Sequence, residues 1–123
     1  MEKAVKLVVQ VPCLNEEATL PLVLESIPTK IDGVDEIIIL IVDDGSTDQT
    51  IEVAKKHGVK HFVRHAKNMG LARSFQDGVN YALKLGADIV VNTDGDNQYP
   101  QEKIGDLVQS ILRGEVEIVV ADR

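Results

Sequence analysis

Cysteine, aromatic residues and long apolar runs are scarce in this 123-residue chain. Its single cysteine, Cys13, excludes an internal disulfide and fits a reducing compartment. Aromatic side chains make up only 3% of the residues, which argues against a stacking surface for single-stranded nucleic acid. No apolar run approaches the roughly 20 residues of a membrane span, and the N-terminus lacks the apolar region of a secretory signal. We therefore expect a cytoplasmic protein with no transmembrane segment in this chain.

Basic residues are outnumbered, because 13 lysines and arginines stand against 20 acidic residues and give a net charge of −7. A protein that binds the backbone of nucleic acids would be expected to carry a basic patch, and none is visible. We therefore predict no nucleic-acid partner. An acidic protein that binds an anionic diphosphate needs a cation, or a few well-placed arginines and lysines, to do so.

Strand and helix patterns alternate along the whole chain, and its length suits one domain. This alternation predicts an α/β fold, a doubly wound, Rossmann-like and mostly parallel sheet of about five strands with helices on both faces. The expected strands are Lys6–Val11, Glu36–Val42, Lys60–Arg64, Asp88–Asn92 and Glu117–Val120. The expected helices lie within Glu16–Ile27, over Thr47–His57, over Leu71–Leu85 and from Pro100 to about Gly114. Ser46 and Gln49 have the spacing of a capping box for the second of these helices.

Clusters of polar residues follow each predicted strand. In open parallel sheets, ligands bind beyond the carboxyl ends of the strands, so all five clusters should lie on one rim. The clusters are Pro12–Glu17, Asp43-Asp44, Asn68–Gly70, Asp94–Gln98 and Asp122-Arg123. Their arrangement therefore predicts one binding site built from several loops.

The segment Asp94-Gly95-Asp96 is the most informative of these clusters, and it follows a strongly apolar strand. Two carboxylates two residues apart in an extended segment point the same way. At the end of a strand they could hold Mg²⁺ or Mn²⁺ through oxygen ligands, and a diphosphate needs such an ion to be bound or to leave. The alternative is a pair of surface carboxylates in a turn. A calcium-binding helix–loop–helix is excluded, because its glycine and glutamate are not at the required positions.

The segment Asp43-Asp44-Gly45-Ser46 has two interpretations. It is either a turn with a helix cap, or a place where one carboxylate accepts hydrogen bonds from the base or ribose of a nucleotide, and we expect this carboxylate to be Asp44. Dinucleotide-binding folds also carry an acidic residue here, but they need a glycine-rich first loop. The first loop of this chain has no glycine, which argues against a nicotinamide or flavin enzyme.

Other polar residues have simpler alternatives. The segment Asn15-Glu16-Glu17 can be a helix cap with favourable charges, and Asn68-Met69-Gly70 can be an ordinary helix start. Cys13 is more typical of a small rim or core residue than of a nucleophile, because no base is assigned to it.

The three histidines are spaced by four residues, but a glycine and a strand pattern interrupt any common helix. We expect independent, solvated histidines and keep only the one nearest the rim, His65, as a minor site candidate.

Four segments together resemble the family-two glycosyltransferases, with the greatest similarity to the branch that uses dolichol or polyprenyl phosphate. In family order, they are Val11-Pro12-Cys13-Leu14-Asn15-Glu16-Glu17, Val42-Asp43-Asp44-Gly45-Ser46-Thr47-Asp48, Lys67-Asn68-Met69-Gly70 and Asp94-Gly95-Asp96-Asn97-Gln98-Tyr99-Pro100. The resemblance implies a GT-A fold, in which a nucleotide-binding α/β half precedes an acceptor-binding half. It covers nearly the whole chain.

The resemblance also implies roles for individual residues. It places Pro12, Leu14 and Glu16 in the nucleotide pocket and Asp44 at the base. It implies that the DxD motif surrounds Mg²⁺ or Mn²⁺ on the donor diphosphate. The residues expected at the nucleotide sugar are Pro12, Leu14, Asn15, Glu16, Asp43, Asp44, Asn68, Gly70, Asp94, Gly95 and Arg123, and the expected metal ligands are Asp94, Asp96 and Gln98.

The implied reaction transfers a sugar from a UDP- or GDP-sugar, with inversion, to an acceptor such as a polyprenyl phosphate. The chain ends where the family's acceptor half would begin, so the general base is not expected here and the chain alone can be inactive. It would be a truncated piece, a split enzyme half or a natural fragment, located in the complete protein at the inner face of the membrane. The unfinished edge of the sheet favours self-association. The alternatives are a non-catalytic nucleotide-sugar-binding module and a metal-dependent nucleotidyltransferase or phosphatase.

Overall fold

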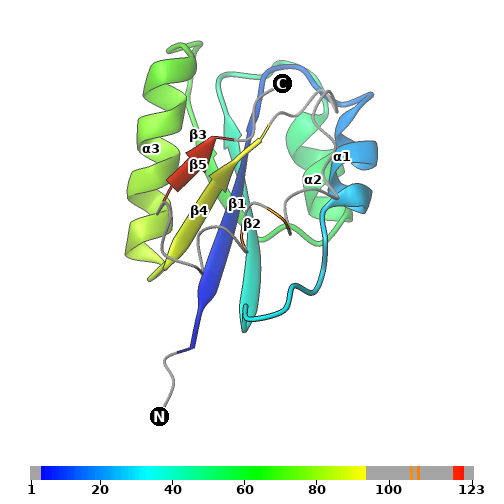
Figure 1. The fold of residues 1–123 in the computed structure, drawn as a ribbon. Coiled ribbons are helices and arrows are strands. Elements are labelled where there is room, and N and C mark those ends of the chain that lie inside the picture. The colour runs from blue at the N-terminus through cyan, green and yellow to red at the C-terminus, as the bar shows by residue number, and fades with distance from the viewer. Residues whose placement is uncertain (1–3, 94–105, 107, 109–117, 121–123) are drawn as a thin grey trace.

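A parallel sheet forms the centre of the protein in a computed structural model, which describes residues 4–93, 106, 108 and 118–120. The strand order across the sheet is β3-β2-β1-β4-β5, and every neighbouring pair is parallel (Figure 1). The strands are β1 (Lys6–Cys13), β2 (Glu36–Asp43), β3 (His61–Arg64), β4 (Ile89–Asn92) and β5 (Ile118–Val120). The prediction of an α/β fold with a five-stranded parallel sheet is confirmed.

Within residues 4–93, three helices cover the two faces of this sheet. They are α1 (Leu20–Ser26), α2 (Thr50–Lys56) and α3 (Leu71–Lys84). The first two lie on one face and α3 lies on the other, as the doubly wound arrangement requires (Figure 1). Asp106 and Val108 are also helical, within the region where the sequence predicts a fourth helix.

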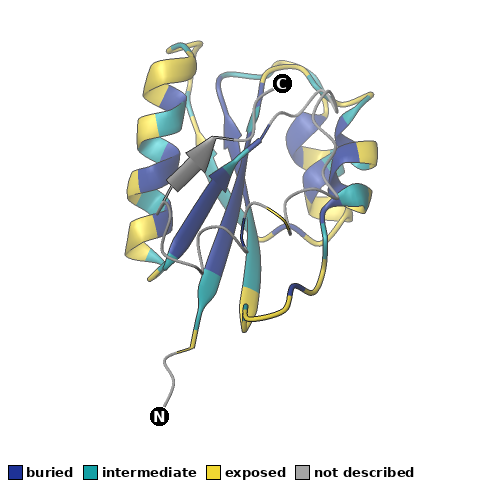
Figure 2. Ribbon diagram, in the orientation of Figure 1, coloured by how far each residue is buried: buried dark blue, intermediate teal, exposed yellow. Residues whose placement is uncertain are grey.

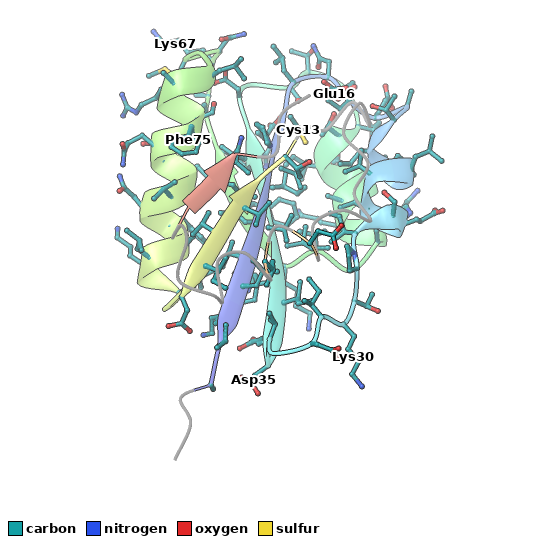
Figure 3. The ribbon with its side chains drawn as sticks, in the orientation of Figure 1. Cys13, Glu16, Lys30, Asp35, Lys67 and Phe75 are labelled. Atoms are coloured by element: carbon teal, nitrogen blue, oxygen red, sulfur yellow. The ribbon has the colours of Figure 1, made fainter. Side chains whose placement is uncertain are left out.

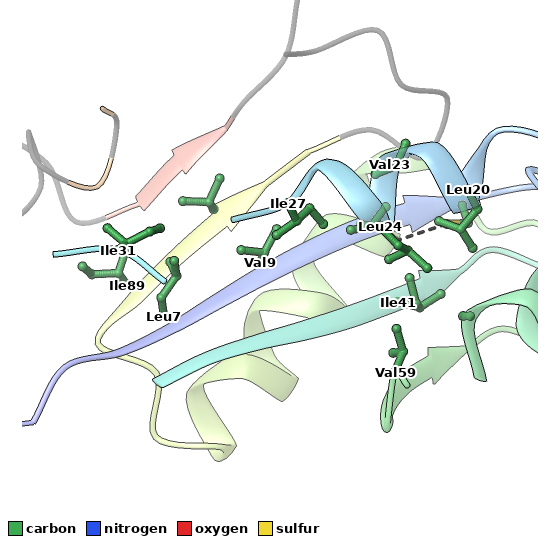
Figure 4. Close-up of a cluster of buried hydrophobic side chains, with 14 of the residues drawn as sticks. Leu7, Val9, Leu20, Val23, Leu24, Ile27, Ile31, Ile41, Val59 and Ile89 are labelled. Carbon is green, nitrogen blue, oxygen red and sulfur yellow. Dashed lines mark hydrogen bonds between the residues drawn. The ribbon is translucent and has the colours of Figure 1, made fainter. Parts of the chain in front are cut away.

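The core consists of one apolar layer on each face of the sheet. Side chains of β1, β2 and β4 that point toward α1 and α2 form the larger layer, which includes Leu7, Val9 and Ile41 (Figure 4). The side chains between the sheet and α3 include Val8, Leu40 and Val90. Strand β1 lies in the middle of the sheet, so both of its faces are buried, and this explains its nearly continuous apolar sequence (Figure 2).

One predicted detail of the helices is wrong, although α1 agrees with its prediction. Helix α1 begins at Leu20, within the expected Glu16–Ile27, with Pro21 in its first turn, where proline is tolerated. Helix α2 begins at Thr50 with Gln49 at the N-cap position, and no side chain caps it there. The predicted capping box of Ser46 and Gln49 does not form, because the Ser46 hydroxyl accepts a hydrogen bond from the backbone N–H of Asn15 instead.

The carboxyl ends of the strands meet at one edge of the sheet. Backbone hydrogen bonds join them: the N–H of Asp44 donates to the carbonyl of Cys13, and the N–H of His65 donates to the carbonyl of Asp43. Each donor–acceptor distance is 2.9 Å. The loops after β1, β2 and β3 therefore start side by side. Figure 3 places Cys13, Glu16 and Lys67 at this end of the molecule, and Lys30 and Asp35 at the opposite end.

Candidate functional site

The loop after β1 is held against the loop after β2 by the side chain of Asn15. Its Oδ1 accepts hydrogen bonds from the backbone N–H groups of Thr47 (2.8 Å) and Asp48 (3.3 Å). Asn15 has a φ of 54°, in the left-handed region, which asparagine tolerates better than most residues. The Asn15-Glu16-Glu17 segment therefore serves to join two loops, rather than only to cap α1.

Further bonds extend this junction toward α2. The backbone N–H of Glu16 donates to the hydroxyl of Thr50 (2.9 Å), and that of Glu17 donates to the carboxylate of Asp48 (3.3 Å). Burial of Asp48 opposes a lowered pKa, but the hydrogen bonds from Thr50 and Glu17 outweigh it and hold the pKa of this carboxyl below its usual value. The first two loops thus form one connected unit.

The two predicted aspartates at the end of β2 do different things. Asp43 is 1% exposed, and its Oδ1 accepts a hydrogen bond from the N–H of Ser46 (3.2 Å). It shapes the loop from within. Asp44, although only 7% exposed, points toward the loop that follows β3.

Asp44 is the residue that organises this third loop. Its Oδ1 accepts hydrogen bonds from the N–H of Met69 (2.7 Å) and from Nδ1 of His65 (2.8 Å). Its Oδ2 accepts from the N–H of Gly70 (3.0 Å). One carboxylate therefore fixes the start of α3 relative to β2 and β3.

Two glycines allow the loops to come this close. Gly45 has a φ of +94°, and a Cβ at this position would lie 2.8 Å from the carbonyl carbon of Lys67. Gly70 has a φ of 98° and a ψ of 161°, a conformation that essentially only glycine adopts. A side chain at position 45 would clash with the third loop, whereas one at position 70 would have space but would be strained by the backbone conformation.

His65 links Asp44 to helix α3. Its Nε2 lies 2.8 Å from Oδ2 of Asp77, and the Nε of Arg73 lies 3.0 Å from the same oxygen. The side chain of His65 is only 10% exposed. The expectation of solvated histidines is therefore wrong for His65, because the fold encloses its ring between two carboxylates.

The sequence analysis did not identify Arg73 and Asp77 as site residues. Their spacing of four residues on a predicted helix is the one signal that could have indicated them, because it allows an ion pair one turn beyond the rim. The other two histidines lie apart from this group, since His57 contacts Glu25 and His61 contacts the hydroxyl of Tyr81.

The charged forms of His65 and its neighbouring carboxylates stabilise one another. The hydrogen bond to Asp44 raises the pKa of His65, partial burial opposes this, and the bond to Asp77 raises it further. Burial alone would raise the pKa of Asp44, but the hydrogen bonds from His65, Met69 and Gly70 outweigh it and leave the pKa lowered. An ionised carboxylate is an acceptor only, so hydrogen bonds from both ring nitrogens of His65 require the imidazolium form, which the raised pKa favours.

These shifts predict how stability depends on pH. The raised pKa of His65 gives a stabilisation that is complete below the ordinary value of 6.5 and is lost as pH rises through the raised pKa. The lowered pKa of Asp44 also gives a stabilisation. It is complete above pH 3.8, the ordinary pKa of this carboxyl, and is lost as pH falls through the lowered pKa. We expect the stability difference between wild type and His65→Asn, measured by urea unfolding, to shrink as pH rises above the ordinary value of 6.5 and through the raised pKa of His65. A difference that grows over this range would contradict the assignment of an imidazolium.

The remaining predicted residues of the first three loops are accessible. Leu14 is 39% exposed, Pro12 and Gly70 are half-buried, and Asn68 is exposed. The Oδ1 of Asn68 accepts a hydrogen bond from the N–H of Gly70 (3.0 Å), which stiffens the third loop. Of the predicted nucleotide-binding residues, those on the first three loops thus lie at one edge of the sheet.

The end of β4 is fixed by Gln10 of β1. The amide of Gln10 donates to Oδ1 of Asn92 (2.9 Å), and the N–H of Thr93 donates to the carbonyl of Gln10 (3.0 Å). The next residues in the chain are those of the DxD motif. Asp94, Gly95, Asp96, Gln98 and Arg123 all lie outside the described residues. Within the described part, no cluster of three or more His, Cys, Asp or Glu side chains could hold a metal ion.

Three further findings concern features other than the three loops. Cys13 is 3% exposed, and burial, reinforced by nearby carboxylates, raises the pKa of its thiol, so Cys13 is a core residue as predicted. A pocket of about 330 Å³ lies at the other edge of the sheet, beside Glu36–Ile39 and His57–His61, and shares no residue with the three loops. No helix in the described ranges is long and apolar enough to span a bilayer.

Comparison with known proteins adds independent evidence. The model of the family described as "Glycosyl transferase family 2" matches residues 8–123. The UDP-N-acetylglucosamine--dolichyl-phosphate N-acetylglucosaminyltransferase of Methanococcus voltae is 30% identical over 129 residues, which cover 92% of this chain and 50% of that protein. The chain thus spans about half the length of this curated relative.

Solved structures show the same relationship. Glucosyl-3-phosphoglycerate synthase from Mycobacterium tuberculosis, in complex with Mn²⁺, UDP and glucosyl-3-phosphoglycerate, aligns with a TM-score of 0.70 and 30% identity over 89% of this chain and 40% of that one. The complex of the same enzyme with Mg²⁺ and UDP aligns with a TM-score of 0.67 and 32% identity over 89% of this chain and 40% of that one. The family match extends over nearly the whole chain and agrees with the parallel sheet and its rim of joined loops, and so the chain belongs to glycosyl transferase family 2.

Proposed function

We propose that this chain is the donor-binding part of an inverting glycosyltransferase that takes a sugar from a UDP- or GDP-sugar. The observation that carries the proposal is the joining of three loops at the carboxyl edge of the sheet, where ligands of open parallel sheets bind. Family membership and the UDP bound to the solved relatives support the same ligand class.

Residues of each of the three loops are assigned to a part of the proposed nucleotide-sugar ligand. Pro12, Leu14 and Glu16 on the first loop would contact the nucleotide, with Asn15 holding that loop against the second. Asp44 would accept a hydrogen bond from the base, and Asp43 would keep the loop in shape. Asn68 and Gly70 would border the same ligand from the third loop, and Arg123 would meet a phosphate.

A divalent ion fits the chemistry of the DxD motif. Asp94, Asp96 and Gln98 offer only oxygen ligands, which Mg²⁺ and Mn²⁺ prefer. The hydrogen bonds between Gln10 and the end of β4 fix the residues that immediately precede the motif. When bound, such an ion would stabilise the charge that develops on the departing nucleoside diphosphate. Complexes of solved relatives with Mn²⁺ or Mg²⁺ support this role.

A polyprenyl phosphate is the acceptor that we propose. A curated relative is named for transfer to dolichyl phosphate, and a phosphate acceptor is already an anion. Such an acceptor can attack the anomeric carbon without a general base, whereas a hydroxyl acceptor needs one. The rest of the donor chemistry consists of holding the sugar nucleotide in place for attack from the opposite face.

Calorimetric titration of UDP and GDP tests the donor site directly. We expect one nucleoside diphosphate to bind in the presence of Mn²⁺ and to bind more weakly, or not at all, in EDTA. Failure of both nucleotides to bind under either condition would refute the proposal that these loops form a donor site.

A further inference from the structure

The carboxylate of Asp44 has little hydrogen-bonding capacity left. A carboxylate offers about four lone-pair sites, two on each oxygen. On Asp44, Oδ1 already accepts from the N–H of Met69 at 2.7 Å and from His65 at 2.8 Å. Among the described residues, Oδ2 accepts only from the N–H of Gly70 at 3.0 Å, and that N–H is shared with Oδ1 of Asn68. One full site therefore remains, and it is on Oδ2.

The bond from His65 that fills Oδ1 is firmly held. The imidazolium lies between two carboxylates, with 2.8 Å to Asp44 and 2.8 Å to Asp77. Arg73 holds Asp77 in turn through Nε, 3.0 Å and 3.2 Å from its two carboxylate oxygens. With its side chain 10% exposed, His65 has little room to turn away and release Oδ1 to a ligand.

Uracil and guanine place different demands on a carboxylate. Uracil presents a single N–H, at N3, between two carbonyl groups. Guanine presents two adjacent donors, N1–H and the exocyclic amine, which pair side by side with the two oxygens of one carboxylate, as the two N–H groups of arginine do. A carboxylate with one oxygen already occupied can accept the single N–H of uracil, but it can accept only one of the two adjacent donors of guanine.

We propose that His65, by occupying Oδ1 of Asp44, makes this aspartate an acceptor for a single N–H and so selects uracil over guanine in the donor. This inference rests on the proposed donor site and adds its base specificity. His65 is a positioning residue here, since it acts through Asp44. Asp77 and Arg73 also act as positioning residues, because Asp77 holds His65 and Arg73 holds Asp77.

The expected preference is substantial. A hydrogen bond to a charged group contributes about tenfold or more to affinity, and guanine would lose one. We expect UDP to bind at least about tenfold more tightly than GDP, with Mn²⁺ present. Inosine diphosphate, a purine of the same shape without the exocyclic amine, should bind at least as tightly as GDP.

Two matched variants separate selection by His65 from a merely structural effect. In His65→Asn the amide nitrogen replaces Nδ1 and still reaches toward Asp44, so the preference for UDP should persist. In His65→Gln the amide lies near the place of Nε2 and reaches toward Asp77, so Oδ1 becomes free. We expect the UDP-to-GDP ratio of this variant to narrow to less than about threefold, mainly because GDP binds better.

The measurements are titrations of UDP, GDP and inosine diphosphate into wild type and both variants, after circular dichroism has shown that each is folded. Equal binding of UDP and GDP by wild type would overturn the inference while the donor site stands. GDP bound at least about tenfold more tightly than inosine diphosphate would overturn it too, and this comparison needs no variant. Failure of wild type to bind any of the three would refute the donor site itself, and this inference with it.

Discussion

Replacing Asp44 by alanine is expected to weaken nucleotide binding at least about tenfold, both with Mn²⁺ and in EDTA. The reason is that Asp44 has two functions at once. It is the proposed acceptor for the base, and it fixes the third loop through the N–H groups of Met69 and Gly70. Because the metal is expected at a different loop, its presence should not change the size of the effect. Calorimetric titration under both conditions measures it.

The same substitution should lower the free energy of unfolding by about 3 kcal/mol. It leaves two backbone donors and the imidazolium of His65 without their shared partner, and breaking such a partly buried charge pair is costly. Asp88→Ala is a suitable control. The carboxylate of Asp88 also accepts a backbone N–H, that of Lys6 at 2.8 Å, but it lies at the amino end of β4.

The control separates loss of stability from loss of the site. Asp88→Ala should lower stability while leaving the affinity for nucleotide unchanged. If Asp44→Ala affected binding only in the presence of metal, its role at the base would be contradicted. If both variants weakened binding equally, the effect of Asp44 would be attributable to stability alone.

The sequence was sufficient to predict the sheet and the place of the site. Continuous apolar runs such as Glu36–Val42 are typical of strands buried on both faces, and the alternation with helices leaves few topologies. The polar clusters after the first three strands then had to meet at one edge. The structure confirms this for the loops around Asn15, Asp44 and Asn68.

The contacts inside the site could not be predicted, because they join residues distant in sequence. Ser46 has the spacing of a local helix cap, yet its hydroxyl binds Asn15, which lies 31 residues away. His65 follows a strand, and nothing local indicates that Asp44 and Asp77 enclose its ring. Local patterns report what a residue can do, and tertiary packing decides which partner it takes.

These contacts also bear on how the parts of the site depend on one another. The first loop depends on the second through Asn15, and the third depends on the second through Asp44. The second loop is therefore the common support of the proposed nucleotide pocket. The residues that immediately precede the DxD motif are held separately, through hydrogen bonds between Gln10 and the end of β4. Substitutions at the second loop and at the metal motif should accordingly have separable effects.

Asp96→Ala tests the metal motif separately from the second loop. We expect this substitution to abolish metal-dependent nucleotide binding with little loss of stability. We propose that Asp96 is the primary one of the three expected ligands of Mg²⁺ or Mn²⁺, so the site would lose most of its hold on the ion without this carboxylate. Titration of UDP with Mn²⁺ should give the weak affinity that wild type shows in EDTA. Addition of Mn²⁺ should then change nothing.

Asp106→Ala is the matched control for this substitution, because it removes an exposed carboxylate on a helical residue and changes net charge equally. It should bind UDP and Mn²⁺ as wild type does. An Asp96→Ala protein that still bound nucleotide in a metal-dependent way, with wild-type affinity, would refute the metal assignment. Loss of binding in both variants would instead point to the overall negative charge, since both carry one carboxylate fewer. The combination expected here, loss only in Asp96→Ala, is the result that a specific metal ligand requires.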